Sequence, residues 1–243
     1  MKIGYTGWIV AIAATVGLLL PSTVTAQNPA PATAGPAPRM PDGKPDLSGV
    51  WEAPFVHDMS KNGRNQQGAG PLPYTDWAKQ HLGEPTDSQA HCLPPGYTRG
   101  LNAPFPIEIV QRPDRVVILY ENNNLFHIIF TDGRGHPKDL DPLWSGHSIG
   151  KWEGDTLMVD TVGFNEKTVL DTRGNPHSDA LHVVEHFKRT DANHIAYDIT
   201  IEDPKAYTQP WKNVRTFTLM PNWNLLEFSC EENNKDVTEG HIK

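Results

Sequence analysis

The chain has 243 residues, of which 21 are Lys or Arg and 29 are Asp or Glu, so its formal net charge is −8 at pH 7. Binding to nucleic acid or to an anionic membrane surface requires clustered cations, and no basic run occurs in the sequence. Nucleic acid is therefore excluded as an expected partner, and the length suits one β-rich domain with a full core.

The first 26 residues have the pattern of a secretory signal peptide. Lys2 precedes an apolar run over residues 8–20, and the small residue Ala26 marks the expected cleavage point. The run is shorter than the roughly 20 residues of a membrane span, and Pro21 follows it. We expect a secreted protein, with the periplasm as its compartment and no stable membrane insertion after cleavage. A retained membrane anchor is the alternative.

Residues 27–45 are rich in Pro and Ala and poor in large apolar side chains, which predicts a disordered linker. A single β-rich domain is then expected over residues 46–243. It opens with the apolar segment 47–51, and a Gly- and Asn-rich stretch near 59–70 predicts a long loop. Residues 74–84 predict a short helix with Thr75 as its cap.

From Pro106 onward, apolar and polar residues alternate with a period of two, as in half-buried strands. The runs are PIEIVQ, RVVILYE, NLFHIIFT, HSIGKWEG, DTLMVDTV, LHVVEHFKR, HIAYDITIE, VRTFTLMP and NLLEFS. Their mostly short links favour antiparallel neighbours. We therefore expect an all-β fold, an antiparallel up-and-down barrel of the lipocalin or calycin type, with a two-sheet β-sandwich as the alternative.

The sequence has two cysteines, Cys92 and Cys230. In a secreted chain two cysteines favour a disulfide, which would tie the front of the domain to its end. Two free, buried thiols are the alternative. A Cys-based metal site has no support, because no CxxC pattern is present.

Residues 131–188 hold five of the 11 histidines, together with several carboxylates. In LHVVEHF the alternation puts Glu185 on the apolar face of a strand, and it puts His182 and His186 on the opposite face. A carboxylate on an apolar face has a raised pKa, which suits proton transfer. His182 and His186 would lie about 13 Å apart along the strand, too far to share a metal ion.

The candidate catalytic residues are the inward carboxylate and the three histidines at turns or strand ends, namely His136, His147, His177 and Glu185. For Glu185 the alternative is a structural ion pair, for instance with Arg115 or Arg215.

Further polar and aromatic side chains accompany these histidines in the TDGRGHP turn and in the two strands around the Glu153–Asp155 hairpin. The candidate ligand-binding residues are Asp132, Arg134, Trp152, Asp155 and Asp160, with Asp155 and Asp160 on opposite faces of their strand. A divalent metal stays open as a cofactor, although no spacing such as HExxH occurs. Ser148 in GHSIG matches a nucleophile-elbow pattern, but that motif requires a strand-to-helix turn, which this region does not predict.

The blocks PDLSGVW, CLPPG, TDGRGHP, GHSIGKWEGDTLMVDTVGFN, NPHSDALHVVEHF and LLEFSCEEN occur in this order. Together they resemble a large family of secreted bacterial proteins without a known activity, over roughly residues 45–233. The resemblance implies a recurring architecture and an envelope location. It matches most of the candidate residues above, and it departs at His186, where the family usually has Arg.

Three functions remain open from the sequence. The first is a β-barrel that binds a small, partly apolar organic ligand, with His and carboxylate groups at its polar end. The second is an enzyme that uses His and Glu for acid–base or metal chemistry on a small organic substrate. The third is a structural or accessory envelope protein.

Overall fold

The computed structural model describes residues 34–83, 88–230 and 232. The expected signal peptide and residues 27–33 of the expected linker lie outside this described part. Within it, no helix is both long enough and apolar enough to cross a membrane.

Strands dominate the described part of the chain, and helices are few and short. The strands are β1 (Gly49–Glu52), β2 (Gln66–Gln67), β3 (Ile107–Arg112), β4 (Arg115–Tyr120), β5 (Phe126–Phe130), β6 (His147–Glu153), β7 (Thr156–Val162), β8 (His182–Arg189), β9 (His194–Glu202) and β10 (Trp211–Leu219). The helices are α1 (Asp76–Gln80), α2 (Tyr97–Leu101) and two 3-10 turns, η1 (Ser88–His91) and η2 (Asn122–Asn124). Thr75 caps α1 as expected, since its hydroxyl accepts from the backbone N–H of Ala78.

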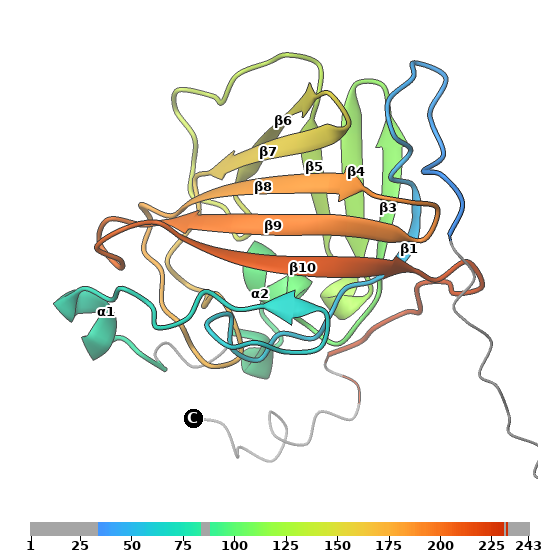
Figure 1. Cartoon of the computed structure of the whole chain (residues 1–243). Helices are drawn as coiled ribbons and strands as arrows, with labels where there is room; N and C mark the ends of the chain where they lie inside the picture. The colour runs from blue at the N-terminus through green and yellow to red at the C-terminus, as the bar shows by residue number, and fades with distance from the viewer. Residues whose placement is uncertain (1–33, 84–87, 231, 233–243) are drawn as a thin grey trace, which may run out of the picture. The chain divides into compact units, whose positions relative to one another are not determined.

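Nine strands close into a barrel, because β1 pairs with β3 on one side and with β10 on the other. The order around the barrel is β1, β3, β4, β5, β6, β7, β8, β9 and β10, and the short β2 adds to β10. In Figure 1 the green strands β3–β5 cross behind the orange and red strands β8–β10. The expected all-β barrel is confirmed.

One pair of strands departs from the expected up-and-down order. β5 and β6 run parallel, with Ile129 opposite Ser148, whereas the other neighbours in the barrel are antiparallel. A parallel pair needs a crossover of about a dozen residues or more, and residues 131–146 supply it. The barrel is therefore mixed, and the crossover lays the TDGRGHP segment over the outside of β6 and β7.

The alternation of side chains along β7 and β8 follows the sequence pattern. Leu157, Val159 and Thr161 of β7 are buried in the barrel, and Glu185 of β8 is fully buried beside its apolar neighbours. His182 and His186 lie on the partly exposed outer face. The inward position predicted for Glu185 is thus correct.

The last expected strand, NLLEFS, is not a strand. The backbone N–H groups of Leu226 and Phe228 donate to side-chain oxygens of Glu121 and Asn124. β1 already occupies the edge of β10 that a further strand would need. The segment instead runs along the η2 turn and ends at the Cys92–Cys230 disulfide, which confirms the predicted bridge.

Residues 34–45, expected as part of a disordered linker, hold defined contacts with the barrel. Arg39 forms a two-pronged ion pair with Asp155 at 2.8 and 2.9 Å, and the backbone N–H of Ala192 donates to Gly35. A tight turn at Gly43 lets the backbone N–H of Met40 donate to Lys44. Hydrogen bonds and two ion pairs, Arg39–Asp155 and Lys44–Asp42, hold this segment in place of apolar burial.

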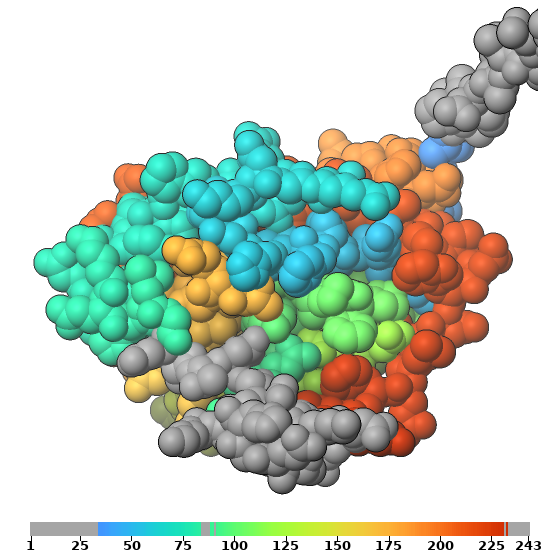
Figure 2. Space-filling view, turned by 90° about the horizontal axis from the view of Figure 1, so that it is seen from below, coloured from blue at the N-terminus to red at the C-terminus, as the bar shows by residue number. Residues whose placement is uncertain are grey.

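Loops cover one end of the barrel. In Figure 1 the helices α1 and α2 and the strand β2 gather below β10. Seen from below in Figure 2, the cyan residues that follow β1 lie beside the yellow-orange loop between β7 and β8. The two segments are joined there, because the backbone N–H of Arg173 donates to the carbonyl of His57.

Candidate functional site

The four candidate catalytic residues occupy three separate places. His136 and His147 lie on the outer wall of the barrel, Glu185 lies inside it, and His177 lies in the buried loop between β7 and β8. The sequence therefore identified residues of interest but not one shared cavity.

On the outer wall, two histidines and one aspartate form a chain of hydrogen bonds. Nε2 of His136 lies 3.0 Å from Oδ1 of Asp160, and Nδ1 of His136 lies 2.8 Å from Nδ1 of His147. Asp160 comes from β7, His147 opens β6, and His136 comes from the crossover. The parallel β5–β6 pair is what brings the crossover over these strands.

His182 extends this chain across to β8 and β9. Its Nε2 lies 3.2 Å from Oδ1 of Asp160, and its Nδ1 lies 2.9 Å from Oε2 of Glu202. The sequence placed His182 on the strand face opposite Glu185, and it lies there. The outer-wall cluster is defined here as His136, His147, Asp160, His182 and Glu202.

The environment of His147 favours its neutral form. Partial burial lowers its pKa, and the charges of His136 and Arg134 lower it further. The ring of His147 stacks on Phe130, and the guanidinium of Arg134 lies 4.0 Å from the centre of that Phe130 ring. Arg134 is held by Asp132, which accepts hydrogen bonds from both Nε and Nη2 of the guanidinium, and these bonds lower the pKa of Asp132.

A groove of about 470 Å³ adjoins the outer-wall cluster. Its apolar lining comes from Ile149, Trp152 and Met158, and its polar lining includes Arg134 and Asp160. Lys44, from the segment before β1, lines the same groove 6.0 Å from the centre of the Trp152 ring. Three of the five candidate ligand-binding residues thus share one groove.

The other two candidate ligand-binding residues support the groove from outside. Asp132 orients Arg134, and Asp155 at the β6–β7 turn binds Arg39 of the segment before β1. That ion pair holds the segment that carries Lys44. Asp160 faces outward and Asp155 is exposed at the hairpin turn, so neither aspartate points into the barrel.

Inside the barrel, Glu185 is the centre of a second polar group. Its Oε1 accepts hydrogen bonds of 2.6 Å from the hydroxyls of Tyr97 and Tyr197, and burial raises its pKa to about 7. Its Oε2 has no hydrogen-bond partner among the described residues. Near neutral pH the folded protein therefore holds Glu185 partly protonated.

Arg215 is the positive counterpart of Glu185, but the two do not form a direct ion pair in the described part of the chain. Its Nε donates to Asn213 at 2.7 Å, and its guanidinium lies 5.7 Å from the centre of the Tyr197 ring. Both terminal nitrogens lack partners there, and burial lowers the Arg215 pKa. Of the two arginines considered as ion-pair partners of Glu185, Arg215 lies near it without forming the predicted ion pair. The other, Arg115, pairs with Asp114 instead.

A line of buried hydroxyl and imidazole groups continues from this centre. The ring of His127 stacks on Tyr97, its Nε2 lies 2.7 Å from Oγ of Ser148, and that oxygen lies 2.6 Å from Oγ1 of Thr161. Burial lowers the pKa of His127 to about 3, so its ring is neutral. Ser148 is a buried strand residue, which agrees with a chance match to the elbow pattern.

His177 has a structural environment. Its Nε2 lies 2.7 Å from Oγ1 of Thr168, its Nδ1 lies 3.0 Å from the carbonyl of Ser178, and burial lowers its pKa. Both ring nitrogens are thus used within its own loop. The geometry fixes the loop between β7 and β8 and leaves His177 no free nitrogen for chemistry.

Sequence reasoning missed most of the interior partners of Glu185. Tyr197 and His127 lie on alternating strands, so strand parity could have placed them inward with Glu185. Tyr97 lies in α2 after two prolines, and no local signal indicates that this turn enters the barrel. The position of Arg215 also follows from the pairing of β10 with β9, which residue spacing alone does not define.

Comparison of the chain with protein-family models, with curated proteins and with solved structures gave no match. The fold and the disulfide define the class: an all-β barrel protein with a bridge of the kind found in oxidising compartments. Among the described residues, no three His, Cys, Asp or Glu side chains are arranged to hold a metal ion, so no metal site is assigned.

Proposed function

We propose that this barrel binds a small, partly apolar organic molecule in the groove on the outer wall of β6 and β7. The observation that carries the proposal is the lining of that groove. Trp152, Ile149 and Met158 offer apolar contact area, and Arg134 and Asp160 stand beside them as polar anchors. A concave, mainly apolar site with a few oriented polar groups is the usual form of a small-molecule site.

The polar anchors are held in place before any ligand arrives. Asp160 is fixed by His136 and His182, and Arg134 is fixed by Asp132 and by the face of Phe130. Side chains that are already ordered lose little entropy on binding, so the groove is suited to recognition.

The setting that fits this role is the periplasm or another secreted location. The disulfide and the signal-like first 26 residues support it, and so does the resemblance to the family of secreted bacterial proteins. We propose membership in that family on the same blocks of sequence.

Amide chemical shifts measured during titration with a library of small aromatic and aliphatic molecules test the proposal. Ligands are expected to shift the signals of Gly150, Lys151 and the indole of Trp152, and Trp152→Ala should abolish those shifts. Trp223→Ala, at an exposed tryptophan outside the groove, is the matched control. Shifts confined to other surfaces, or no shifts, would contradict the proposal and favour an accessory envelope role.

An enzyme is the second candidate, favoured by the Asp160–His136–His147 chain. If His136 donates Nε2–H to Asp160, its Nδ1 accepts from Nδ1–H of His147, and Nε2 of His147 keeps a lone pair. No described residue donates to that nitrogen, so it could act as a general base. Conversion of a bound molecule that stops in His147→Gln and continues in His194→Gln would support catalysis.

A further inference from the structure

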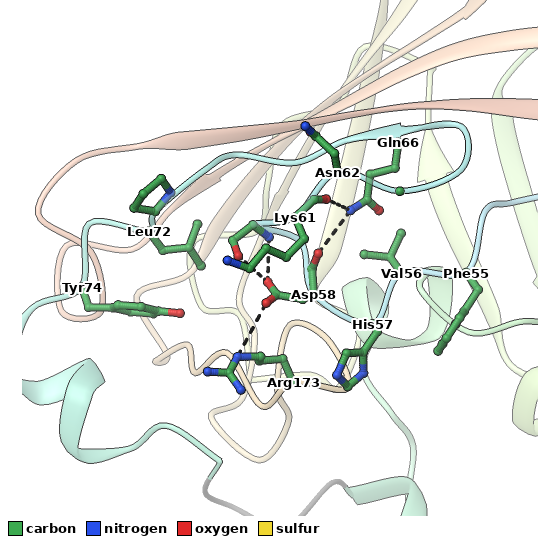
Figure 3. Close-up of a pocket in the computed structure, with 13 residues that line it drawn as sticks. Phe55, Val56, His57, Asp58, Lys61, Asn62, Gln66, Leu72, Tyr74 and Arg173 are labelled. Carbon is green, nitrogen blue, oxygen red and sulfur yellow. Dashed lines mark hydrogen bonds and ion pairs between the residues drawn. The ribbon is translucent and has the colours of Figure 1, made fainter.

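A second cavity, with a volume of about 630 Å³, lies at the loop-covered end of the barrel (Figure 3). Its walls come from residues 55–74, which follow β1, and from Arg173 in the loop between β7 and β8. It shares no lining residue with the outer-wall groove. Any ligand of this cavity is therefore independent of the proposed function above.

Apolar side chains line the cavity at two ends. Figure 3 shows Leu72 and Tyr74 at one end and Val56 and Phe55 at the other, with Asp58 between them. An apolar group of a ligand that lies against Leu72 and Tyr74 would be removed from water.

Two cations lie beside Asp58 in the cavity. Nζ of Lys61 has no ion-pair partner among the described residues, and Nε of Arg173 lies 3.6 Å from Oδ2 of Asp58. The carboxylate of Asp58 also has other partners, because its Oδ1 accepts hydrogen bonds from the backbone N–H and the hydroxyl of Ser60. Figure 3 shows the ammonium of Lys61 and the guanidinium of Arg173 on the same side of Asp58 as the hydroxyl of Tyr74.

The walls of the cavity are fixed by hydrogen bonds. Tyr74 donates to Asn175, Asn175 donates to the buried carboxylate of Asp171, and that carboxylate also accepts from the backbone N–H of Met59. Nδ1 of His57 lies 2.6 Å from the hydroxyl of Thr172, one residue before Arg173. The cavity is thus preformed, which reduces the entropy lost when a ligand binds.

We propose that this cavity is a binding site for a small organic carboxylate with an apolar body. Lys61 and Arg173 exceed the charge of Asp58 by one, which matches a monoanion. This local excess of cations occurs in a chain whose net charge is −8. The planar guanidinium of Arg173 still has two terminal nitrogens to donate in parallel to a carboxylate, and the ligand's apolar body would lie against Leu72 and Tyr74.

Calorimetric titration of the full chain with phenylacetate and hexanoate tests this site, with the corresponding amides as uncharged controls. The carboxylates should bind, and the amides should bind about tenfold more weakly or less. Lys61→Gln/Arg173→Gln should weaken carboxylate binding by at least about tenfold. The control Arg112→Gln/Lys138→Gln removes the same charge from exposed positions elsewhere and should leave affinity unchanged.

A second variant separates the two halves of the site. Leu72→Ala should weaken phenylacetate but leave acetate unchanged, because acetate has no apolar body to lie against Leu72. The proposal is overturned if no carboxylate binds at millimolar concentration, if the amides bind equally well, or if Lys61→Gln/Arg173→Gln retains full affinity. Tighter binding of inorganic phosphate would assign the cations to a different anion and equally reject the proposal. Trp152→Ala should not change any of these affinities, which keeps this result separate from that for the outer-wall groove.

Discussion

Nδ1 of His136 lies 2.8 Å from Nδ1 of His147, while the other ring nitrogen of His136 faces Asp160. Two such nitrogens can approach this closely only when one carries a proton and the other does not. The lowered pKa of His147 favours its neutral ring, so it has a single N–H to place.

This arrangement predicts the tautomers of both rings. In their neutral forms His136 should carry its proton on Nε2 and His147 should carry its proton on Nδ1. Long-range proton–nitrogen NMR of histidine-labelled protein at pH 8 distinguishes the two forms. Asp160→Asn should change the His136 pattern, while Asp198→Asn, beside His186, should not. A His147 ring protonated on Nε2 in the native chain would contradict this prediction.

Glu185 should make the protein less stable as the pH rises. Its folded-state pKa is about 7 against an ordinary value of 4.5, because burial disfavours the charged form. The folded state therefore holds a proton that the unfolded state has lost between these two values, and stability falls across that window. The full effect is on the order of 3 kcal/mol.

Glu185→Gln should remove most of this dependence, because an amide can still accept from both tyrosines and does not ionise. Urea unfolding at pH 5 and at pH 7.5 measures the difference. Glu153→Gln, at an exposed carboxylate, should retain the native pH dependence. If the unfolding free energy depended on pH with the same slope in the native protein and in Glu185→Gln, the carboxylate would be better solvated than its burial implies.

His127 should act in the opposite direction. Its folded-state pKa is about 3 against an ordinary value of 6.5, so only the unfolded chain takes up the proton between these values. Stability should fall as the pH drops through this window, by about 2 kcal/mol between pH 6.5 and pH 5. Between pH 6.5 and pH 5 the Glu185 contribution has the opposite sign, so the test is the difference between His127→Gln and the native chain. His127→Gln should gain stability relative to the native chain as the pH falls through this window, and His194→Gln on the surface should not. Equal slopes of unfolding free energy against pH in the native chain and His127→Gln would argue against a dry environment for His127.

Loss of the disulfide should lower stability substantially. The bridge closes a loop with a sequence separation of 138 residues, for which chain entropy predicts about 5 kcal/mol. In a domain of this size such a loss corresponds to a melting temperature roughly 10 to 15 °C lower. Cys92→Ser/Cys230→Ser, compared with the native chain in calorimetry, measures the change. A drop of only a degree or two would show that residues 220–230 are held by their other contacts.

The strand pattern made the fold class predictable, because side-chain alternation reports burial directly along each strand. Glu185 is the clearest case, since apolar neighbours two residues away on either side place it inward. NLLEFS has the same kind of pattern, but its predicted pairing fails because β1 already occupies the edge of β10. Strand pairing depends on which strands compete for an edge, and single-strand periodicity does not contain that information.

The sequence predicted which residues are chemically suited to a site, but not which of them lie close together in the folded chain. The crossover carrying His136 lies over β6 and β7 because β5 and β6 are parallel, and the sequence favoured antiparallel links. The cavity of Figure 3 is not predictable from the sequence, because the stretch after β1 predicts only a polar loop. Its cations, Lys61 and Arg173, come from two distant loops, and their proximity depends on tertiary packing.

The double pairing of β1 has a consequence for how the chain reaches its native state. β1 is the first strand in sequence order and β10 the last, yet Trp51 pairs with Leu219 to close the barrel. Closure must therefore wait until the whole domain has been synthesised, and contacts of this range fold slowly. A chain cut short before β10 would leave both β1 and β9 with open edges, which are ready templates for aggregation.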